Sequence, residues 1–307
     1  MQPVAWARGR RNASSIPAAG TRSRTEERRP WGRRGTARGG GGSMTSVAQS
    51  SVQAEMIEVA GTPVALRRRG AGAPLLFLHG AGFTGLWTAF LEELSSAAEV
   101  WAPDHIGFGA TPAQDWMTGV DDLVLHYEDL RREQGWERID VVGYSLGGWI
   151  AAAYATVYPE RVGRLVLITP VGLRVPGKPI ADVMMMTPQR LYATLFNDPT
   201  NIPQVAPDPS DLGVVVHIYE EMTTVARLLW NPRHDPKLPR RLRRITSPAL
   251  IVGAEDDRLV PNEMCDLYAS LIGGARVERV PGTGHALIIE QPERTARLVL
   301  DFLGEGR

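Results

Sequence analysis

Ser145 has the surroundings of a nucleophile. It lies between two glycines in Gly143-Tyr144-Ser145-Leu146-Gly147, directly after the apolar run IDVVG and at the start of an Ala-rich apolar stretch. Small residues on both sides of a serine are typical of a sharp turn from a strand to a helix, where larger side chains would collide. At such a turn the hydroxyl projects from the edge of a sheet, so we interpret Ser145 as a nucleophile.

A serine hydroxyl needs a histidine as general base and an acidic group that orients this histidine. Two aspartates, Asp256 and Asp257, follow the apolar run ALIVGA, and His285 follows VERV and the turn residues PGTG. Of the six histidines, His285 alone comes after the last predicted strand, which fits the chain order serine, aspartate, histidine. The sequence therefore predicts a base at His285 and an acid at one of the two aspartates.

The elements that must position these residues alternate between strands and helices. We expect an antiparallel pair of strands in residues 55–70, and then alternating strands and helices to the end of the chain, including a helix over 120–133. This order predicts an α/β fold with a mostly parallel sheet covered by helices on both faces. Residues 171–245 contain many prolines and no convincing strand, so we expect a mostly helical cap insertion there.

Several large apolar residues of this insertion have two interpretations. They either line an apolar substrate pocket under the cap or form the core of the cap itself. These residues are Met184–Met186, Tyr192, Phe196, Tyr219 and Trp230. Their sequence pattern favours neither interpretation.

Five segments together resemble the α/β-hydrolase superfamily, and the likeness extends from about residue 56 to the C-terminus. They are LLFLHGAGFTG, APDHIGFGATP, VVGYSLGG, SPALIVGAEDDRLVP and GTGHALIIEQPE. The resemblance implies an α/β-hydrolase domain over 55–307 with a cap over 171–245. It also implies an oxyanion hole of two backbone N–H groups, one from Leu146 after the nucleophile and one from Ala81.

The same resemblance favours Asp257 as the acid. In family members the acid usually lies nine residues after the proline that opens its strand and four before the proline that opens the next helix. Counting from Pro248 and back from Pro261 reaches Asp257. The family's glycine usually stands three residues before the acid, and counting from Gly253 selects Asp256 instead. Two of the three counts favour Asp257, and Asp256 remains the alternative.

The predicted activity is hydrolysis of a small, partly apolar ester through an acyl-enzyme. A serine at the turn argues against dehalogenase and epoxide hydrolase chemistry, which uses an aspartate nucleophile in this superfamily. The motifs also resemble the branch that hydrolyses carbon–carbon bonds in ring-fission (meta-cleavage) products. Lactonases, thioesterases and perhydrolases use the same triad of serine, histidine and aspartate. A ligand receptor with a residual triad is the alternative of a different class; slow turnover with tight ligand binding would identify it.

Composition limits the partners of the protein. The 307 residues carry 34 basic and 34 acidic side chains, but the first 43 hold ten Arg and only two Glu. The remainder is mildly acidic and gives no reason to expect nucleic acid. The expected partner is a small-molecule substrate. We predict no metal, because His234-Asp235 lacks the further ligands that a metal site needs, and we predict no cofactor. No pattern in the sequence indicates the oligomeric state.

Residues 1–50 are expected to be a disordered leader. They are rich in Arg, Gly and Ser, lack apolar periodicity, and show no apolar stretch after Arg10-Arg11 such as an export signal needs. Translation could also start later, at Met44 or Met56. Cys265 is the only cysteine, so no intramolecular disulfide can form, and a reducing, cytoplasmic location is expected. No apolar run approaches the roughly 18 residues of a membrane span.

Overall fold

The computed structural model describes residues 52–206, 210–229 and 233–306, so the predicted leader lies outside the described residues. In this described part, eight strands form one sheet in the order β1-β2-β4-β3-β5-β6-β7-β8. The strands are β1 (Glu55–Val59), β2 (Thr62–Arg69), β3 (Pro74–Leu78), β4 (Glu99–Pro103), β5 (Ile139–Tyr144), β6 (Val162–Ile168), β7 (Ala249–Ala254) and β8 (Arg276–Val280).

Six neighbouring strands of this sheet, from β4 to β8, run parallel to one another, while β2 is antiparallel to both β1 and β4. Every residue of β5 and β7 is buried, as expected for parallel strands that are covered on both faces. The edge strand β8 buries only Val280 fully. The short apolar runs of the sequence therefore form the centre of the sheet, and the predicted mostly parallel arrangement is confirmed.

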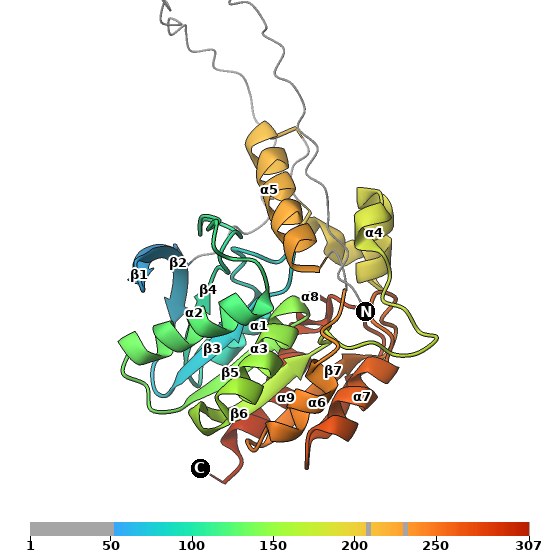
Figure 1. Ribbon diagram of the computed structural model, residues 1–307. Helices are drawn as coiled ribbons and strands as arrows, with labels where there is room; N and C mark the ends of the chain where they lie inside the picture. The colour runs from blue at the N-terminus through green and yellow to red at the C-terminus, as the bar shows by residue number, and fades with distance from the viewer. Residues whose placement is uncertain (1–51, 207–209, 230–232, 307) are drawn as a thin grey trace, which may run out of the picture. The chain divides into compact units, whose positions relative to one another are not determined.

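Helices cover the two faces of this sheet. In Figure 1, α2 and α3 lie in front of the central strands and α9 behind them; α2 packs against α3, and α1 packs against α9. No described helix is long and apolar enough to cross a bilayer. The helices are α1 (Ala89–Ser95), α2 (Val120–Glu133), α3 (Leu146–Val157), α4 (Pro188–Leu195), α5 (Leu212–Leu229), α6 (Leu238–Arg241), α7 (Glu263–Leu271), α8 (Leu287–Glu290) and α9 (Pro292–Gly304).

A long segment separates β6 from β7. Its described residues form α4, α5, α6 and short 3₁₀ turns, with no strand of the sheet. Figure 1 shows α4 and α5 on the same side of the sheet, whereas α6 packs near α3. The chain thus leaves the sheet after β6, adds mainly helical structure, and returns to it at Ala249.

Candidate active site

Ser145 lies at a sharp turn between β5 and α3. Its φ of 54° and ψ of −111° belong to a region that residues with a side chain rarely adopt. The turn also needs glycine, because a Cβ on Gly143 would lie 2.3 Å from the carbonyl oxygen of Gly147, and a Cβ on Gly147 would lie 2.0 Å from that of Leu78. The prediction that larger neighbours would collide at this turn is confirmed.

His285 connects Ser145 with Asp257. Its Nε2 lies 2.9 Å from Oγ of Ser145, and its Nδ1 lies 2.8 Å from Oδ2 of Asp257. The side chains of His285 and Asp257 are 1% and 2% exposed. Because the carboxylate can only accept a hydrogen bond, Nδ1 carries the ring proton and Nε2 presents its lone pair to the serine hydroxyl. This arrangement can remove a proton from Ser145.

The sheet topology brings these three residues together from distant parts of the sequence. Ser145 follows β5, Asp257 follows β7 and His285 follows β8, so each lies beyond the C-terminal end of a parallel strand. Open α/β sheets bind ligands at this edge, because the loops after the parallel strands meet there.

The structure brings Asp257, and not Asp256, to the histidine. Oδ1 of Asp257 accepts two backbone hydrogen bonds, the shorter from Val260 at 2.8 Å, and this leaves Oδ2 for His285. The side chain of Asp256 is exposed and accepts a hydrogen bond from Nδ2 of Asn197 at 3.2 Å. Of the two candidates from the sequence, only Asp257 can orient the imidazole.

The two backbone groups expected to bind an oxyanion border the same cavity as Ser145. Leu146 is the first residue of α3, so its N–H has no partner inside the helix. The N–H of Ala81, in the loop after β3, has no acceptor among the residues that the structure describes. Both donors can therefore bind a negatively charged oxygen, and the N-terminal end of α3 favours such a charge.

A cavity of about 350 Å³ opens onto Ser145 and His285, and its lining is mainly apolar. Part of the lining comes from the segment between β6 and β7, including Met184 and Tyr192. Other members of the predicted apolar set lie elsewhere. Met185 and Tyr219 are 79% and 72% exposed, and Phe196 is buried outside the lining; Trp230 is not among the described residues.

Polar side chains in the wall of the cavity contact one another in pairs. Asp182 and Arg233 form an ion pair of 2.9 Å, and Nε2 of His217 lies 3.3 Å from the carboxylate of Glu221. Among the residues that the structure describes, no three His, Cys, Asp or Glu side chains converge as a metal ion would require. The arrangement suits acyl-transfer chemistry on an apolar molecule better than recognition of a strongly charged one.

Glu290 holds the loop that carries His285, a role that the sequence did not indicate. Its Oε2 accepts a hydrogen bond from the N–H of Gly284 at 2.6 Å. Its Oε1 accepts two more, from the N–H groups of Asn197 at 2.7 Å and Asp198 at 2.6 Å. One carboxylate therefore joins the loop of His285 to the segment between β6 and β7. Glu290 belongs to the segment GTGHALIIEQPE, but nothing in that pattern indicates which backbone groups its carboxylate contacts.

We expect Glu290→Gln to destabilise the protein by about 1–3 kcal/mol and to lower kcat by up to about 100-fold, since His285 would lose its exact placement. A glutamine has one carbonyl oxygen, so its NH2 group would face backbone donors on one side. Urea unfolding and ester turnover at a temperature well below the unfolding midpoint measure the two effects. Glu293→Gln, an exposed change in α9, is the matched control; equal behaviour of the two variants would contradict this role.

Comparison with known proteins agrees with this geometry. Residues 75–298 match a model of the alpha/beta hydrolase family. The chain belongs to this family. It is 31% identical over 269 residues to a 2-hydroxy-6-oxononadienedioate/2-hydroxy-6-oxononatrienedioate hydrolase of Paraburkholderia phymatum. The match covers 77% of this chain and 89% of the relative. The alpha/beta hydrolase fold and a hydrolytic enzyme, both predicted from the sequence, are confirmed.

Relatives of different activity match this alpha/beta hydrolase about equally well. It is 30% identical over 261 residues to a poly(3-hydroxyalkanoate) depolymerase of Ectopseudomonas oleovorans, with 76% of this chain and 85% of the relative covered. Among solved structures, a mutant of a meta-cleavage product hydrolase matches with a TM-score of 0.70 and 25% identity, over 83% of this chain and 99% of the other. Similarity alone therefore does not select one substrate.

Proposed function

We propose that this alpha/beta hydrolase is a serine esterase that acts on a small, uncharged and largely apolar ester. The observation that carries the proposal is the chain of hydrogen bonds from Ser145 through His285 to Asp257, at the base of an apolar cavity. Each of these groups has the partner that its role in acyl transfer needs. The apolar lining favours a substrate whose acyl or alcohol portion is hydrophobic.

In the proposed mechanism, Oγ of Ser145 attacks the ester carbonyl carbon while Nε2 of His285 takes the hydroxyl proton. The N–H groups of Ala81 and Leu146 bind the oxygen that becomes negative. The C–O bond then breaks, and the imidazolium gives its proton to the leaving alcohol. A water molecule, deprotonated by His285, attacks the acyl-enzyme and releases the carboxylic acid and the free serine. Asp257 holds the ring and stabilises its positive charge throughout.

We also propose that residues 171–245 form a cap over this site. Support comes from the cavity, because Ile180, Met184, Tyr192 and Val225 of this segment face the same space as Ser145. An apolar cover excludes water from the cavity, which strengthens the hydrogen bonds to the developing charge. It also limits the size of the substrate that can reach the serine.

Cleavage of carbon–carbon bonds in ring-fission products is the second candidate, and the names of the relatives favour it. A dienoate or dioate is anionic, so its burial in an apolar cavity requires a cationic partner. Arg233 is the only Lys or Arg among the described residues that line the cavity, and it already pairs with Asp182. This pairing is the reason for preferring an uncharged ester.

The proposal is tested with a fluorophosphonate probe and two substrates. We expect the probe to label Ser145, and 4-nitrophenyl butyrate to be hydrolysed with a kcat/KM at least about 100-fold above that for a 2-hydroxy-6-oxo-dienoate, a difference of roughly 2.7 kcal/mol. Faster cleavage of the dienoate would instead establish carbon–carbon hydrolysis. Labelling without turnover of either compound, together with tight ligand binding, would indicate a receptor.

A further inference from the structure

We propose that His79 is a positioning residue for the oxyanion hole: it holds the peptide between Gly80 and Ala81 so that the N–H of Ala81 faces the substrate oxygen. The inference rests on the proposed function, because this N–H is an oxyanion donor only if acyl transfer takes place at Ser145. His79 directly follows β3 and is 5% exposed. It does not border the cavity, so it would act through the backbone and not by touching substrate.

The carbonyl of Gly80 belongs to the same peptide unit as the N–H of Ala81. Nδ1 of His79 lies 3.0 Å from this carbonyl oxygen. In a planar trans peptide, C=O and N–H point in opposite directions, so a contact that fixes one of them also fixes the other. A hydrogen bond from His79 to Gly80 therefore prevents the peptide from turning its N–H away from the cavity.

This peptide is close to the nucleophile turn. A Cβ on Gly80 would lie 2.9 Å from the ring of Tyr144 and 3.1 Å from Cβ of Ser145. The loop after β3 thus packs against the turn that carries the nucleophile. A rotation of the peptide between Gly80 and Ala81 would change the donor groups presented beside Ser145.

The tautomer of His79 follows from its second contact. The backbone N–H of His105 donates a hydrogen bond to Nε2 of His79 at 3.0 Å. That nitrogen must therefore keep its lone pair, which places the proton of the neutral ring on Nδ1, facing Gly80. Burial lowers the pKa of His79 below its usual value, although the carboxylate of Asp104 acts in the opposite direction. The ring consequently stays neutral and remains a donor at Nδ1.

His105 completes the arrangement from the loop after β4. Its ring stacks on that of His79 with 3.8 Å between the centroids, and its Nε2 donates to the carbonyl of His79 at 2.9 Å. The hydroxyl of Tyr127 donates to its other nitrogen, Nδ1. Burial lowers the pKa of His105 well below its usual value. The two rings are thus neutral, and each donates one hydrogen bond and accepts another; Oγ1 of Thr84 also lies 3.5 Å from Nδ1 of His79.

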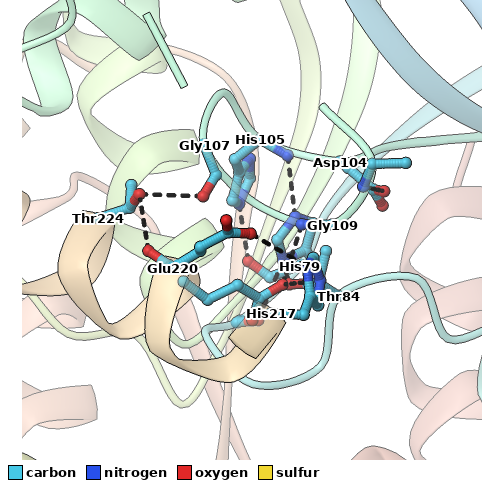
Figure 2. A network of polar contacts seen from close by, with 12 residues as sticks. His79, Thr84, Asp104, His105, Gly107, Gly109, His217, Glu220 and Thr224 are labelled. Atoms are coloured by element: carbon cyan, nitrogen blue, oxygen red, sulfur yellow. Dashed lines mark hydrogen bonds and ion pairs between the residues drawn. The ribbon is translucent and has the colours of Figure 1, made fainter. Parts of the chain in front are cut away.

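The loop that carries His105 is attached to α5 by two hydrogen bonds. The hydroxyl of Thr224 donates to the carbonyl of Gly107 at 3.0 Å, as Figure 2 shows. The carboxylate of Glu221 also accepts from the N–H of Gly109 at 2.9 Å. Helix α5 also contributes residues to the cavity wall. Hydrogen bonds, together with the backbone of the loop after β4, therefore connect the cavity wall through His105 and His79 with the proposed oxyanion donor.

A competing explanation is that the turn alone orients the peptide. The N–H of Phe83 also donates to the carbonyl of Gly80, at 3.2 Å. If this bond were sufficient, the imidazole of His79 would be only a packing group. The two explanations predict different activities for a variant that removes the N–H donor of His79 but keeps a side chain of similar volume.

The variants His79→Asn and His79→Leu make this comparison, because Asn and Leu have nearly the same shape. Asn places an N–H2 donor where Nδ1 was, whereas Leu has none, and both lose the acceptor for the N–H of His105. We expect His79→Leu to lower kcat for 4-nitrophenyl butyrate about 100-fold with little change in KM, and His79→Asn to restore most of it. His234→Leu, outside the cavity, is the control for a histidine replaced by leucine.

A thiono ester separates an oxyanion defect from a general one. Sulfur is a weak hydrogen-bond acceptor, so turnover of the thiono analogue of 4-nitrophenyl butyrate depends little on the oxyanion hole. The ratio of oxo to thiono turnover should fall about 100-fold in His79→Leu and remain near the wild-type ratio in His79→Asn. Equal kcat in both variants, or an unchanged ratio in His79→Leu, would overturn the proposal.

The tautomer itself can be tested in the wild-type protein, whether or not the variants fold. Nitrogen-15 NMR of histidine-labelled protein should show a protonated Nδ1 and an unprotonated Nε2 for His79; the reverse tautomer would overturn the proposal. Failure of the proposed function is distinguishable from these results. In that case the wild-type enzyme itself would cleave the dienoate faster than the ester, or would hydrolyse neither compound.

Discussion

Replacement of Ser145 by alanine should lower kcat for 4-nitrophenyl butyrate by about 10⁶-fold, because losses of this size follow removal of a serine nucleophile in enzymes of the same chemistry. The loss of Oγ leaves His285 without a group to deprotonate. The oxyanion donors remain, so a small rate above that of water is retained. Labelling by the fluorophosphonate should disappear completely.

The fold should survive this change. Ser145 has a φ of 54°, and alanine at the same backbone conformation is strained to a similar degree, so the unfolding midpoint should remain close to that of the wild type. Ser247→Ala is a matched control, since Oγ of Ser247 is buried without a hydrogen-bond partner among the described residues. We expect this control to retain full turnover. Turnover that persists in Ser145→Ala after repeated purification would refute the assignment of the nucleophile.

Replacement of Asp257 by asparagine should lower kcat by about 10⁴-fold, the effect expected when the base is held in the wrong tautomer. Oδ1 of Asp257 accepts hydrogen bonds from the N–H groups of Leu259 at 2.9 Å and Val260 at 2.8 Å. In the variant these donors would bind the amide oxygen, so the NH2 group would face Nδ1 of His285. The ring proton would then move to Nε2, which could no longer accept the proton of Ser145.

Asp256→Asn is the natural control for this experiment, because the neighbouring carboxylate is exposed and bonds to Asn197. Its kcat should stay within about twofold of the wild type, as for most exposed substitutions. Steady-state turnover of 4-nitrophenyl butyrate and the rate of fluorophosphonate labelling measure both variants. A larger loss in Asp256→Asn than in Asp257→Asn would show that the alternative count from Gly253 was correct.

Features that depend on neighbouring residues could be predicted from the sequence. The helix expected over 120–133 is α2 with the same bounds, and the strand before Ser145 is β5. A serine between two glycines, after an apolar strand, defines a sharp turn through local backbone geometry alone. The chain order of Ser145 and His285 similarly follows from the order of the strands. These predictions succeeded because short-range sterics and apolar periodicity decide them.

Contacts between distant segments depend on tertiary structure. The sequence counts left both Asp256 and Asp257 possible, and only the backbone N–H groups that hold Oδ1 of Asp257 decide which carboxylate reaches His285. Likewise, Met184 borders the cavity whereas the adjacent Met185 is exposed. Adjacent residues of one type cannot be distinguished by composition, because the direction of each side chain is set by the local backbone and by what packs against it.

The hydrogen bonds that hold the loops around the site could not be predicted from the sequence. The hydrogen bond between His79 and His105 joins residues 26 positions apart, and that between Glu290 and Asn197 joins residues 93 apart. Sequence order alone determined the strand-turn-helix unit of Ser145 and the place of His285 after the last strand. Tertiary structure decided which aspartate contacts His285, which residues line the cavity and which groups hold the loops in place, because these depend on how separate loops meet at one edge of the sheet.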